Sequence, residues 1–354
     1  MASDSDRRQP GITIHDVALR AGVSIGTVSK ALNNQGQISP ATRVRVQEAA
    51  MALRFRPNEL AQSLHRRRSF TVGLISTDRF GRFSLPLIEG IEDALDPARV
   101  AVLLCKPTDD PDHERRHVEW LLAKRVDGLI VTSRRTDARK PVHTPGAALP
   151  VVYAYAQTAE PGAVCVLPDD EGGGALAGRH LAGLGRLRIA HITGPDRFAA
   201  VRERRRGLAR ALDEAGLCLH PQLDVSGQWS EASGYDAVRR LLDSGQPFDA
   251  VFCGSDQIAR GVADALRERG VCIPDDVALV GFDNWEVIAA ATRPALTTVD
   301  PCLQELGRTA ALRLLAMIAG TEHPGGAQQR IPCRLVVRRS CGGRSGQQAA
   351  NEAA

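Results

Sequence analysis

The chain has 354 residues, an ordinary globular composition and a formal net charge of +4 at pH 7. This length suits two or three domains with a sizeable core, and no apolar run reaches the roughly 18 residues that a membrane span requires. The first ten residues, MASDSDRRQP, contain no apolar stretch of a secretory signal, so we expect a cytoplasmic protein. The eight cysteines contain no C-x-x-C pair, which argues against both a zinc ribbon and a disulfide scaffold.

Positive charge is concentrated in residues 1–69. This segment contains eleven Arg and Lys residues against five Asp and Glu, a surplus of six, so the remaining residues carry a net charge of −2. A basic segment on a nearly neutral body indicates a polyanionic partner for that segment alone. A solvated charged surface is the alternative explanation.

Three short helices are predicted in residues 1–56, which we call the head. Thr13 is expected to cap a first helix, IHDVALRA, with Asp16 completing a capping box and Gly22 ending the helix. Ser24 starts a second helix after a turn of only GV, which is the spacing of a helix-turn-helix, and Pro40 begins a third. The expected core residues of the head are Val17, Ala18, Ala21, Val28, Ala31, Leu32, Val44, Ala49, Ala50 and Leu53.

The second helix, within SIGTVSKALN, carries short polar side chains on one face. At 100° per residue, Gly26, Ser29, Lys30 and Asn33 lie opposite Val28. Short side chains on an exposed helix in a basic domain suit insertion into the DNA major groove, where each donor or methyl group can meet a base edge. An ordinary polar helix face is the alternative.

Residues 57–69, PNELAQSLHRRRS, form a separate segment that we call the hinge segment. Ala61 and Leu64 fall on one side of it, and three arginines follow. A helix of about eight residues is too short to be stable alone. We therefore expect the hinge segment to need a partner, which a two-fold dimer would supply with its own copy.

After Ser69, short β-branched runs alternate with amphipathic helical stretches. This alternation predicts a doubly wound α/β fold with parallel sheets, and two sheets fit the length better than one. Ligands of such folds bind beyond the carboxyl ends of the strands, so we expect a clamp of two lobes. The predicted strands cover residues 71–76, 100–105, 127–132, 150–155, 188–193, 249–254 and 277–282.

The segment TIHDVALRAGVSIGTVSKALNNQGQISPATRVRVQEAAMALRFRPNELAQSL resembles the head and hinge of LacI-family bacterial transcription regulators, with the pattern D-V-A-x-x-A-G-V-S-x-x-T-V-S-x-x-L-N intact. The stretches VDGLIV, HLAGLGRLRIAHITGP, SDQIARGVADALRERG, PDDVALVGFDN and PALTTVD resemble the periplasmic-binding-protein-like core of the same family. The resemblance implies a homodimeric repressor that binds a pseudo-palindromic operator in double-stranded DNA and is controlled by a small molecule. It implies no cofactor, no metal and no membrane partner.

The resemblance also implies a domain organisation. It places a helix-turn-helix domain at 1–56, the hinge at 57–69, a ligand-binding core at 70–339 and a flexible tail at 340–354. Within the core it places lobe 1 at about 70–166 and 298–324, and lobe 2 at about 167–297 and 328–339. The tail has no leucine heptads that could join two dimers.

For DNA, the resemblance places Ile25, Gly26 and Lys30 at base-reading positions and Leu64 at the hinge leucine that enters the minor groove. Gly26 departs from the pattern, because many members of the family carry a longer side chain there. The full set of expected DNA contacts is Thr13, Ser24, Ile25, Gly26, Thr27, Ser29, Lys30, Asn33, Asn58, Ala61 and Leu64.

For the effector, the family's ligand positions fall on Phe83, Tyr155, Arg204, Trp229, Ser255 and Asp283. Tyr155 and Trp229 offer flat faces that can stack on a pyranose. Arg204 supplies a fork of donors and Asp283 an acceptor for neighbouring hydroxyls. This set favours a neutral sugar over a phosphate or carboxylate, because Asp283 would repel an anion.

Two other classes of protein are alternatives to a regulator. A sugar-binding protein without a DNA role would explain the core but would leave the helix-turn-helix unexplained. An enzyme is suggested by HERRH at 113–117, which matches the H-E-x-x-H pattern of zinc proteases. However, Val118, Leu121 and Leu122 already give that helix a core stripe, and no third ligand follows at a suitable spacing. We therefore expect no catalytic site.

Overall fold

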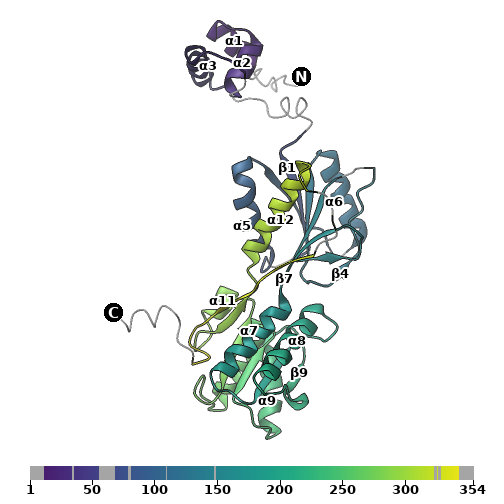
Figure 1. The fold of residues 1–354 in the computed structure, drawn as a ribbon, viewed down its shortest axis with the longest axis vertical. Coiled ribbons are helices and arrows are strands. Elements are labelled where there is room, and N and C mark those ends of the chain that lie inside the picture. The colour runs from purple at the N-terminus through teal and green to yellow at the C-terminus, as the bar shows by residue number, and fades with distance from the viewer. Residues whose placement is uncertain are drawn as a thin grey trace, which may run out of the picture. The chain divides into compact units, whose positions relative to one another are not determined.

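The computed structural model describes residues 12–33, 36–55, 68–78, 81–108, 110–146, 149–322, 325 and 328–342. Contacts within the chain divide it into two units, Met1–Ser69 and Phe70–Ala354. The first unit holds three short helices and the second holds two sheets with their covering helices (Figure 1). The predicted fold class, a helical head with a two-lobed α/β core, is confirmed.

The three predicted helices of the head are present as α1 (Ile14–Ala21), α2 (Ile25–Leu32) and α3 (Pro40–Ala52). The backbone N–H and the hydroxyl of Thr13 donate to Asp16 Oδ2 over 2.7 and 2.8 Å, and these bonds lower the pKa of the Asp16 carboxyl. Gly22 ends α1 at φ 62°, a left-handed conformation that favours glycine. Ser24 Oγ accepts the N–H of Thr27 over 3.1 Å.

The core of the head differs from the prediction at one residue. Val44 has an exposed fraction of 52%, whereas Val46 is fully buried. Val46 lies three and four residues before Ala49 and Ala50, so the three side chains share one face of α3. Val44 lies five residues before Ala49 and faces solvent. The buried residues are Val17, Ala18, Ala21, Val28, Ala31, Val46, Ala49 and Ala50.

Two six-stranded sheets form the second unit, one in each lobe. In lobe 1 the spatial order is β13 (Gln328–Ile331), β7 (Val164–Pro168), β5 (Val151–Ala154), β3 (Gly128–Thr132), β1 (Thr71–Ser76) and β2 (Ala101–Cys105). In lobe 2 it is β14 (Arg334–Val336), β12 (Thr297–Asp300), β11 (Ala278–Phe282), β10 (Ala250–Cys253), β8 (Ile189–Thr193) and β9 (Asp224–Ser226). All pairs are parallel except β12 with β14. A separate parallel pair joins β4 (Ala138–Arg139) to β6 (Gln157–Thr158).

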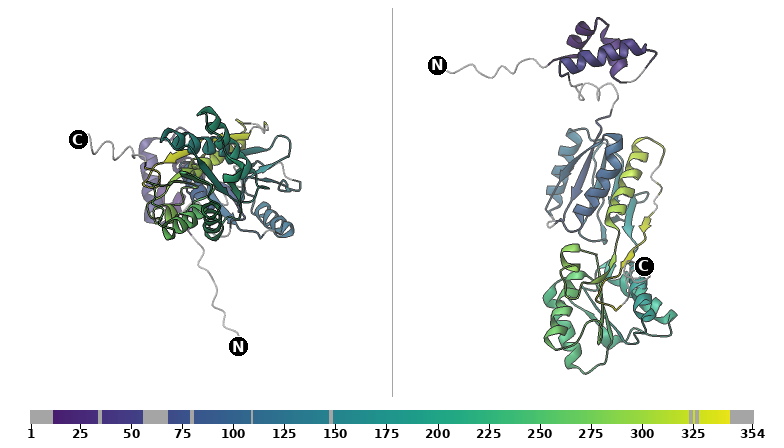
Figure 2. Two further views of the ribbon diagram at one scale, coloured as in Figure 1. Left: turned by 90° about the horizontal axis from the view of Figure 1, so that it is seen from below. Right: turned by 90° about the vertical axis from the view of Figure 1, so that its left-hand side faces the viewer.

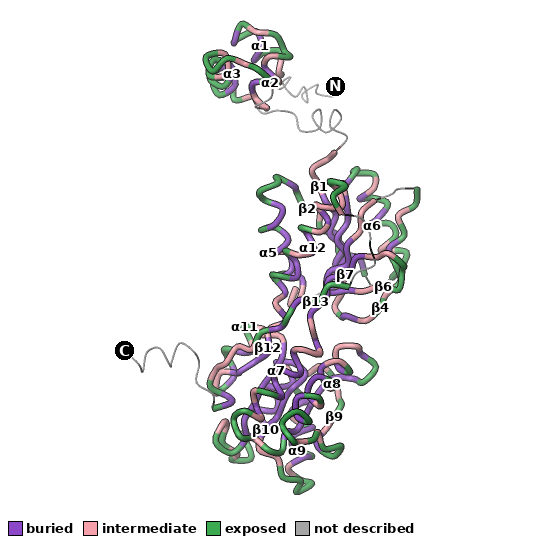
Figure 3. The backbone as a smooth tube through the Cα atoms, in the orientation of Figure 1, coloured by how far each residue is buried: buried purple, intermediate pink, exposed green. Residues whose placement is uncertain are grey.

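Helices cover both faces of each sheet, as expected of a doubly wound fold. Lobe 1 has α5 (Ser84–Leu95), the 3-10 turn η1 (Asp96–Ala98), α6 (Pro111–Ala123) and α12 (Leu303–Ile318). Lobe 2 has α7 (Asp170–Gly183), α8 (Ala199–Glu214), the turn η2 (Pro221–Leu223), α9 (Glu231–Asp243), α10 (Asp256–Glu268) and α11 (Glu286–Ala289). The views in Figure 2 show α5 and α12 together on one side of the lobe 1 sheet. Burial is concentrated on the strands and on the inner faces of these helices (Figure 3).

The chain crosses between the lobes three times, a few residues away from the expected boundaries. β7 extends lobe 1 to Pro168, and β12 keeps lobe 2 up to Asp300 because it pairs with β11. β13 pairs with β7 and so belongs to lobe 1, which moves the last crossing to the residues between Ile331 and Arg334. The three crossings therefore run side by side between the sheets.

The start of the expected tail is part of lobe 2. Ser340 and Cys341 are buried, and Ser340 Oγ accepts the N–H of Thr297 over 2.8 Å and donates to the carbonyl of Leu279 over 2.6 Å. The remainder of the expected tail, from residue 343 onward, lies outside the described residues. None of the helices in the described parts of the chain is long and apolar enough to cross a membrane.

Candidate functional site

The first candidate site is the exposed face of α2. Lys30 and Gly26 are exposed, and Ile25 has an exposed fraction of 46%. A Cβ added at Gly26 would meet only Ser24 Oγ, at 3.8 Å. Packing within the head therefore does not require glycine there, and the position is open to a partner surface.

The other expected DNA contacts of the head have structural partners as well. Thr13 and Ser24 cap their helices, and Ser24 Oγ lies 2.9 Å from Thr27 Oγ1. Asn33 Nδ2 donates to the carbonyl of Ser29 over 2.9 Å. These side chains stabilise the ends of α1 and α2, and they thereby position the exposed face of α2. The expected hinge contacts Asn58, Ala61 and Leu64 lie outside the described residues.

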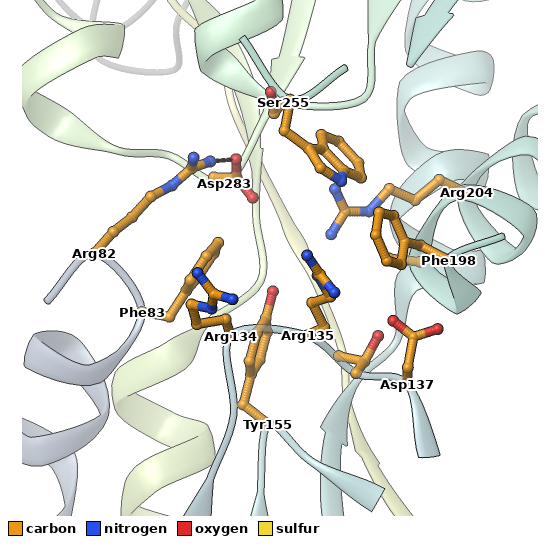
Figure 4. A pocket seen from close by; sticks show the side chains of 13 residues that line it. Arg82, Phe83, Arg134, Arg135, Asp137, Tyr155, Phe198, Arg204, Ser255 and Asp283 are labelled. Carbon is orange, nitrogen blue, oxygen red and sulfur yellow. Dashed lines mark ion pairs between the residues drawn. The ribbon is translucent and has the colours of Figure 1, made fainter. Parts of the chain in front are cut away.

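The second candidate site is a pocket between the two lobes, with a cavity volume of about 140 Å³. All six residues expected to contact an effector line it, and seven further residues join them (Figure 4). The lining residues are Arg82, Phe83, Arg134, Arg135, Thr136, Asp137, Tyr155, Phe198, Ala200, Arg204, Trp229, Ser255 and Asp283.

The topology explains why residues so far apart in the chain meet here. Tyr155 follows β5 and Asp283 follows β11, both directly after the carboxyl ends of parallel strands. Phe83 and Ser255 precede the first residues of α5 and α10, and Ser255 Oγ accepts the N–H of Ile258 over 3.3 Å. Strand ends and helix starts from both lobes thus face one another across the pocket.

Aromatic rings form two walls of the pocket. The rings of Phe83 and Tyr155 stack with centroids 5.0 Å apart, and those of Phe198 and Trp229 lie 6.5 Å apart at 27°. Trp229 packs against the backbone at Gly194, where an added Cβ would fall 2.2 Å from the indole. The indole is therefore held against the backbone of lobe 2, and the Tyr155 ring is held by its stacking on Phe83.

Arg204 is buried in the pocket wall, and three of its five N–H groups have partners within lobe 2. Its Nε and Nη2 each lie 2.7 Å from Asp170 Oδ1, and its Nη1 donates to the carbonyl of Gly254 over 2.7 Å. The guanidinium also lies 3.4 Å from the centre of the Phe282 ring. Lobe 2 therefore uses part of the donor fork that was expected for a ligand, and contact between Arg204 and an effector stays a prediction. Full burial raises the pKa of Asp170, against the opposing effect of Arg204.

A glycine lets α7 and α8 approach closely enough for this ion pair. A Cβ at Gly174 on α7 would lie 2.0 Å from the carbonyl oxygen of Arg204 on α8. Only a residue without a side chain fits there. The Gly-rich run EGGGALAG thus serves helix packing, which in turn aims Arg204 at Asp170.

Asp283 also has a partner, which the sequence analysis missed. Arg82 from lobe 1 forms an ion pair with Asp283 of lobe 2, and its Nη1 donates to Gln257 Oε1 on α10 over 2.9 Å. Its guanidinium lies 4.8 Å from the Phe83 ring and 5.0 Å from the Trp285 ring. Burial lowers the pKa of Arg82. Arg82 therefore bridges the lobes and neutralises the carboxylate that was expected to repel an anion.

The loop after β3 adds residues that the sequence analysis did not select. Arg135 lies 4.2 Å above the Phe198 ring, and Asp137 Oδ1 accepts the N–H of Ala199 at the start of α8 over 2.8 Å. Both contacts join lobe 1 to lobe 2. The signal that could have found this loop is its position, because SRRTD directly follows the carboxyl end of a predicted strand.

The HERRH segment lies on α6, and its residues bind one another or neighbouring groups. His113 Nε2 and His117 Nε2 lie 3.1 Å apart, and the N–H of Thr108 donates to His113 Nδ1 over 3.1 Å. Glu114, the expected base of a protease, forms an ion pair with Arg139 at 2.5 Å. Within the described part of the chain, no three His, Cys, Asp or Glu side chains are grouped to hold a metal ion.

A helix-turn-helix head joined to a two-lobed core with a pocket between its lobes defines a class, the ligand-responsive bacterial transcription regulators. A model described as "Bacterial regulatory proteins, lacI family" matches residues 13–58, and one described as a periplasmic binding protein-like domain matches residues 178–341. The chain belongs to the LacI family of bacterial regulatory proteins.

Similar proteins cover almost the whole chain. The transcriptional repressor CytR of Escherichia coli K12 is 30% identical over 94% of this chain and 97% of its own length. The lac repressor dimer bound to operator and the anti-inducer ONPF is 27% identical, with a TM-score of 0.75 over 94% of this chain and 99% of that one. The regulator CelR in complex with cellobiose is 31% identical, with a TM-score of 0.65 over 94% and 100% of the two chains.

Proposed function

We propose that this protein is a transcriptional repressor that binds operator DNA as a homodimer, and that a small molecule in the interlobe pocket sets its operator affinity. The observation that carries the proposal is the set of contacts that cross from lobe 1 to lobe 2 around the pocket. A ligand there would touch both lobes at once and could change their arrangement.

The proposed DNA site is the exposed face of α2, with Ile25, Gly26 and Lys30 meeting base edges in the major groove. Lys30 supplies a charged donor for guanine, and Ile25 an apolar group for a thymine methyl. We carry over Asn58, Ala61 and Leu64 from the family resemblance as the contacts of the hinge segment. The lac repressor dimer bound to its operator supports this arrangement by its overall likeness.

The proposed effector site holds a ligand between the Phe83–Tyr155 and Phe198–Trp229 walls, within reach of Ser255 and Asp283. A ring with apolar faces and polar edges suits this space, and the CelR–cellobiose complex supports a sugar-type effector. The sequence does not determine whether the effector releases DNA or promotes binding. The outcome depends on which of the two lobe arrangements the ligand prefers.

Contacts across the lobes supply the physical coupling. Arg82 binds Asp283 and Gln257, Asp137 binds the N–H of Ala199, and Arg330 Nη1 lies 2.7 Å from Glu203 Oε2. A ligand shifts the balance between two lobe arrangements only by its difference in affinity for them. The proposal includes no catalytic step, and it places the protein in the bacterial cytoplasm at the nucleoid.

The test is binding of the full-length protein to fragments of the genome that encodes it, followed by titration of the selected operator and a scrambled duplex. We expect the operator to be bound at least about a thousandfold more tightly than the scrambled duplex at physiological salt. Equal affinity for the two duplexes would contradict the proposal. Sedimentation should give the mass of two chains, and a mass of four would contradict the expected dimer.

A further inference from the structure

The helix α6 of lobe 1 carries two histidines on one face. His113 and His117 are four positions apart, so one turn of the helix places their side chains next to one another. Both are partly exposed, whereas Val118 and Leu121 of the same helix are buried in lobe 1. The helix covers the face of the lobe 1 sheet opposite α5 and α12 (Figure 1). Solvent ions can therefore reach the two imidazoles, which do not line the interlobe pocket.

The two imidazoles bring their Nε2 atoms together. His113 Nε2 and His117 Nε2 are 3.1 Å apart, and the ring centroids are 4.6 Å apart with 43° between the ring planes. A metal ion bound by imidazole lies about 2.0–2.1 Å from the nitrogen. An ion at that distance from both nitrogens makes an N–metal–N angle of about 100°, between about 90° in octahedral or square-planar sites and about 109° in tetrahedral ones. The spacing of the two nitrogens therefore fits one shared ion without movement of the helix.

Without a metal ion, the same contact is a hydrogen bond between two neutral rings. The N–H of Thr108 donates to His113 Nδ1 over 3.1 Å, which leaves the ring proton of His113 on Nε2, facing His117 Nε2. A metal ion takes the place of this proton, which moves to His113 Nδ1. Thr108 Oγ1 lies 3.0 Å from Nδ1 and accepts it there. An acceptor on the other ring nitrogen is the usual support of a metal-binding histidine.

A histidine must be neutral to bind a metal ion. Partial burial lowers the pKa of His117, and the neighbouring His113 and Arg116 lower it further. His117 therefore keeps a lone pair on Nε2 at neutral pH.

The charged side chains of α6 largely balance one another around the two histidines. Arg115 Nη2 lies 3.3 Å from Asp112 Oδ1, and Arg115 Nη1 lies 3.3 Å from Glu119 Oε1. Arg116 is exposed, so solvent screens its charge. Asp110 at the N-cap and Asp112 in the first turn offset the positive end of the helix. The two arginines of HERRH therefore do not exclude a cation.

The pair offers two protein ligands and no free carboxylate. Glu114 is held by Arg139 of β4, whose Nη2 lies 2.5 and 2.6 Å from its two oxygens. No third His, Cys, Asp or Glu joins the two histidines in the parts of the chain that the structure describes. Water therefore fills the remaining coordination positions, and Glu114 is not available as a base.

We propose that His113 and His117 bind one divalent transition-metal ion, such as Zn²⁺, Ni²⁺ or Cu²⁺, through their Nε2 atoms. Imidazole nitrogen suits this class of ion, whereas Mg²⁺ and Ca²⁺ prefer oxygen ligands. Thr108 acts as a positioning residue for His113. The family resemblance implies no metal, so the site is a property of this chain's own residues, and it is independent of the proposed regulatory function.

The first experiment measures metal binding by the full-length protein without a polyhistidine tag. Isothermal titration uses CuCl₂, NiCl₂, ZnCl₂ and MgCl₂ at pH 7.5. We expect Cu²⁺ to bind most tightly and Mg²⁺ not to bind at this site. His113→Ala and His117→Ala should each weaken the tightest Cu²⁺ binding step at least about tenfold, because one imidazole ligand is lost. Undiminished Cu²⁺ binding in both variants would overturn the inference.

His143→Ala is the matched control. His143 is an exposed histidine of lobe 1 that lies outside α6. Its loss removes one imidazole while leaving the proposed ligand pair in place, so we expect unchanged Cu²⁺ affinity. A loss as large as that of His117→Ala would show that Cu²⁺ binds exposed histidines in general, against the inference. Equal unfolding temperatures without metal check that all three variants fold.

The second experiment tests the geometry of the site with one equivalent of Cu²⁺. Electron paramagnetic resonance should show two equatorial imidazole nitrogens in the wild-type protein and one in His117→Ala. Thr108→Val keeps the backbone N–H but removes the hydroxyl acceptor, which favours the metal-free tautomer of His113. We expect this variant to bind Cu²⁺ about tenfold more weakly. A single nitrogen in the wild-type spectrum would overturn the shared site, and unchanged affinity in Thr108→Val would overturn the positioning role of Thr108.

Discussion

The exposed face of α2 and the interlobe pocket hold their polar groups in different ways. On α2, Lys30 and Gly26 are exposed, and packing within the head does not fix the side chain at position 26. In the pocket, Arg204 is buried, Arg82 and Asp283 are partly buried, and all three are bound to partners in the same or the opposite lobe. The first surface can take a partner without breaking existing contacts, whereas a ligand of the second must compete with them or add to them. Substitutions on α2 should therefore change binding alone, and substitutions in the pocket should change stability or lobe arrangement.

The largest effect is expected at Arg204. Arg204→Ala leaves Asp170 as an unpaired buried carboxylate and should lower the free energy of unfolding by about 3–5 kcal/mol, measured by urea denaturation. The matched control is Arg206→Ala on the same helix, because Arg206 is exposed and its ion pair with Glu171 lies at the surface. We expect a loss of about 1 kcal/mol or less there. Equal losses of unfolding free energy in the two variants would show that buried and exposed ion pairs contribute alike to stability, against this prediction.

The prediction from the sequence was accurate where local signals decide the structure. The caps at Thr13 and Ser24, the glycine at 22 and the proline at 40 mark helix ends through bonds within one turn, so all three helices of the head were found. All seven predicted strands form, with ends within one residue of the expected positions. Strands of this kind can be predicted from their own residues, because each is a short hydrophobic run bounded by turn residues.

The features that the sequence did not predict depend on contacts between residues that are far apart in the chain. The strands β7, β12 and β13 were not predicted, and β13 joins the sheet only because β7 offers it an edge. Arg204 was expected to contact the effector, but its ion pair with Asp170 was not predicted, because Asp170 is 34 positions away in the chain. The family resemblance led to six pocket residues, but it gave no sign of Arg82, whose partner Asp283 lies on the other lobe. Ion pairs of this kind become visible only in three dimensions.

Loss of effector response without loss of DNA binding is expected at Trp229 and Asp283. Trp229→Ala removes one ring of an aromatic wall, and Asp283→Ala removes the ion pair between Arg82 and lobe 2, while both positions are far along the chain from α2. Operator affinity should stay within about threefold, and the coupling between effector and operator, typically 1–3 kcal/mol, should disappear. Fluorescence anisotropy with and without effector checks this. A folded variant that no longer binds operator would show that the pocket acts on the head by another route.

At Lys30, on the exposed face of α2, we expect a loss of operator binding instead. Lys30→Ala should lower operator affinity by about 1–3 kcal/mol and relax the preference at one position of each half-site, with no change in the unfolding temperature. Arg45→Ala, on the exposed surface of α3, is the control. If Arg45 meets a phosphate, its loss weakens operator and scrambled duplex alike. Equal loss on both duplexes for Lys30→Ala would mean that Lys30 meets phosphates and reads no base.

The smallest effect is expected from pH, through a carboxyl next to the pocket. Burial raises the pKa of Asp256 to about 6, although Thr298 Oγ1 donates to Asp256 Oδ1 over 2.6 Å and the N–H of Trp285 donates to its Oδ2. A folded-state pKa above the unfolded value of 3.8 means that the folded protein binds the proton more tightly. The resulting stabilisation is complete below about pH 4 and is lost as the pH rises through about 6.

Asp256→Asn removes this titration while keeping a side chain of nearly the same shape. Between pH 7.5 and pH 5, the wild-type protein should therefore gain about 1 kcal/mol of unfolding free energy relative to the variant. The measurement is urea denaturation of both proteins at the two pH values, so that every other titrating group cancels in the difference. Asp275→Asn, at an exposed position that also lies in lobe 2, should give no such difference. If the difference in unfolding free energy between wild type and Asp256→Asn is the same at both pH values, Asp256 stays ionised in the folded protein. Burial beside the pocket would then permit a charged side chain, as exposure on the face of α2 does.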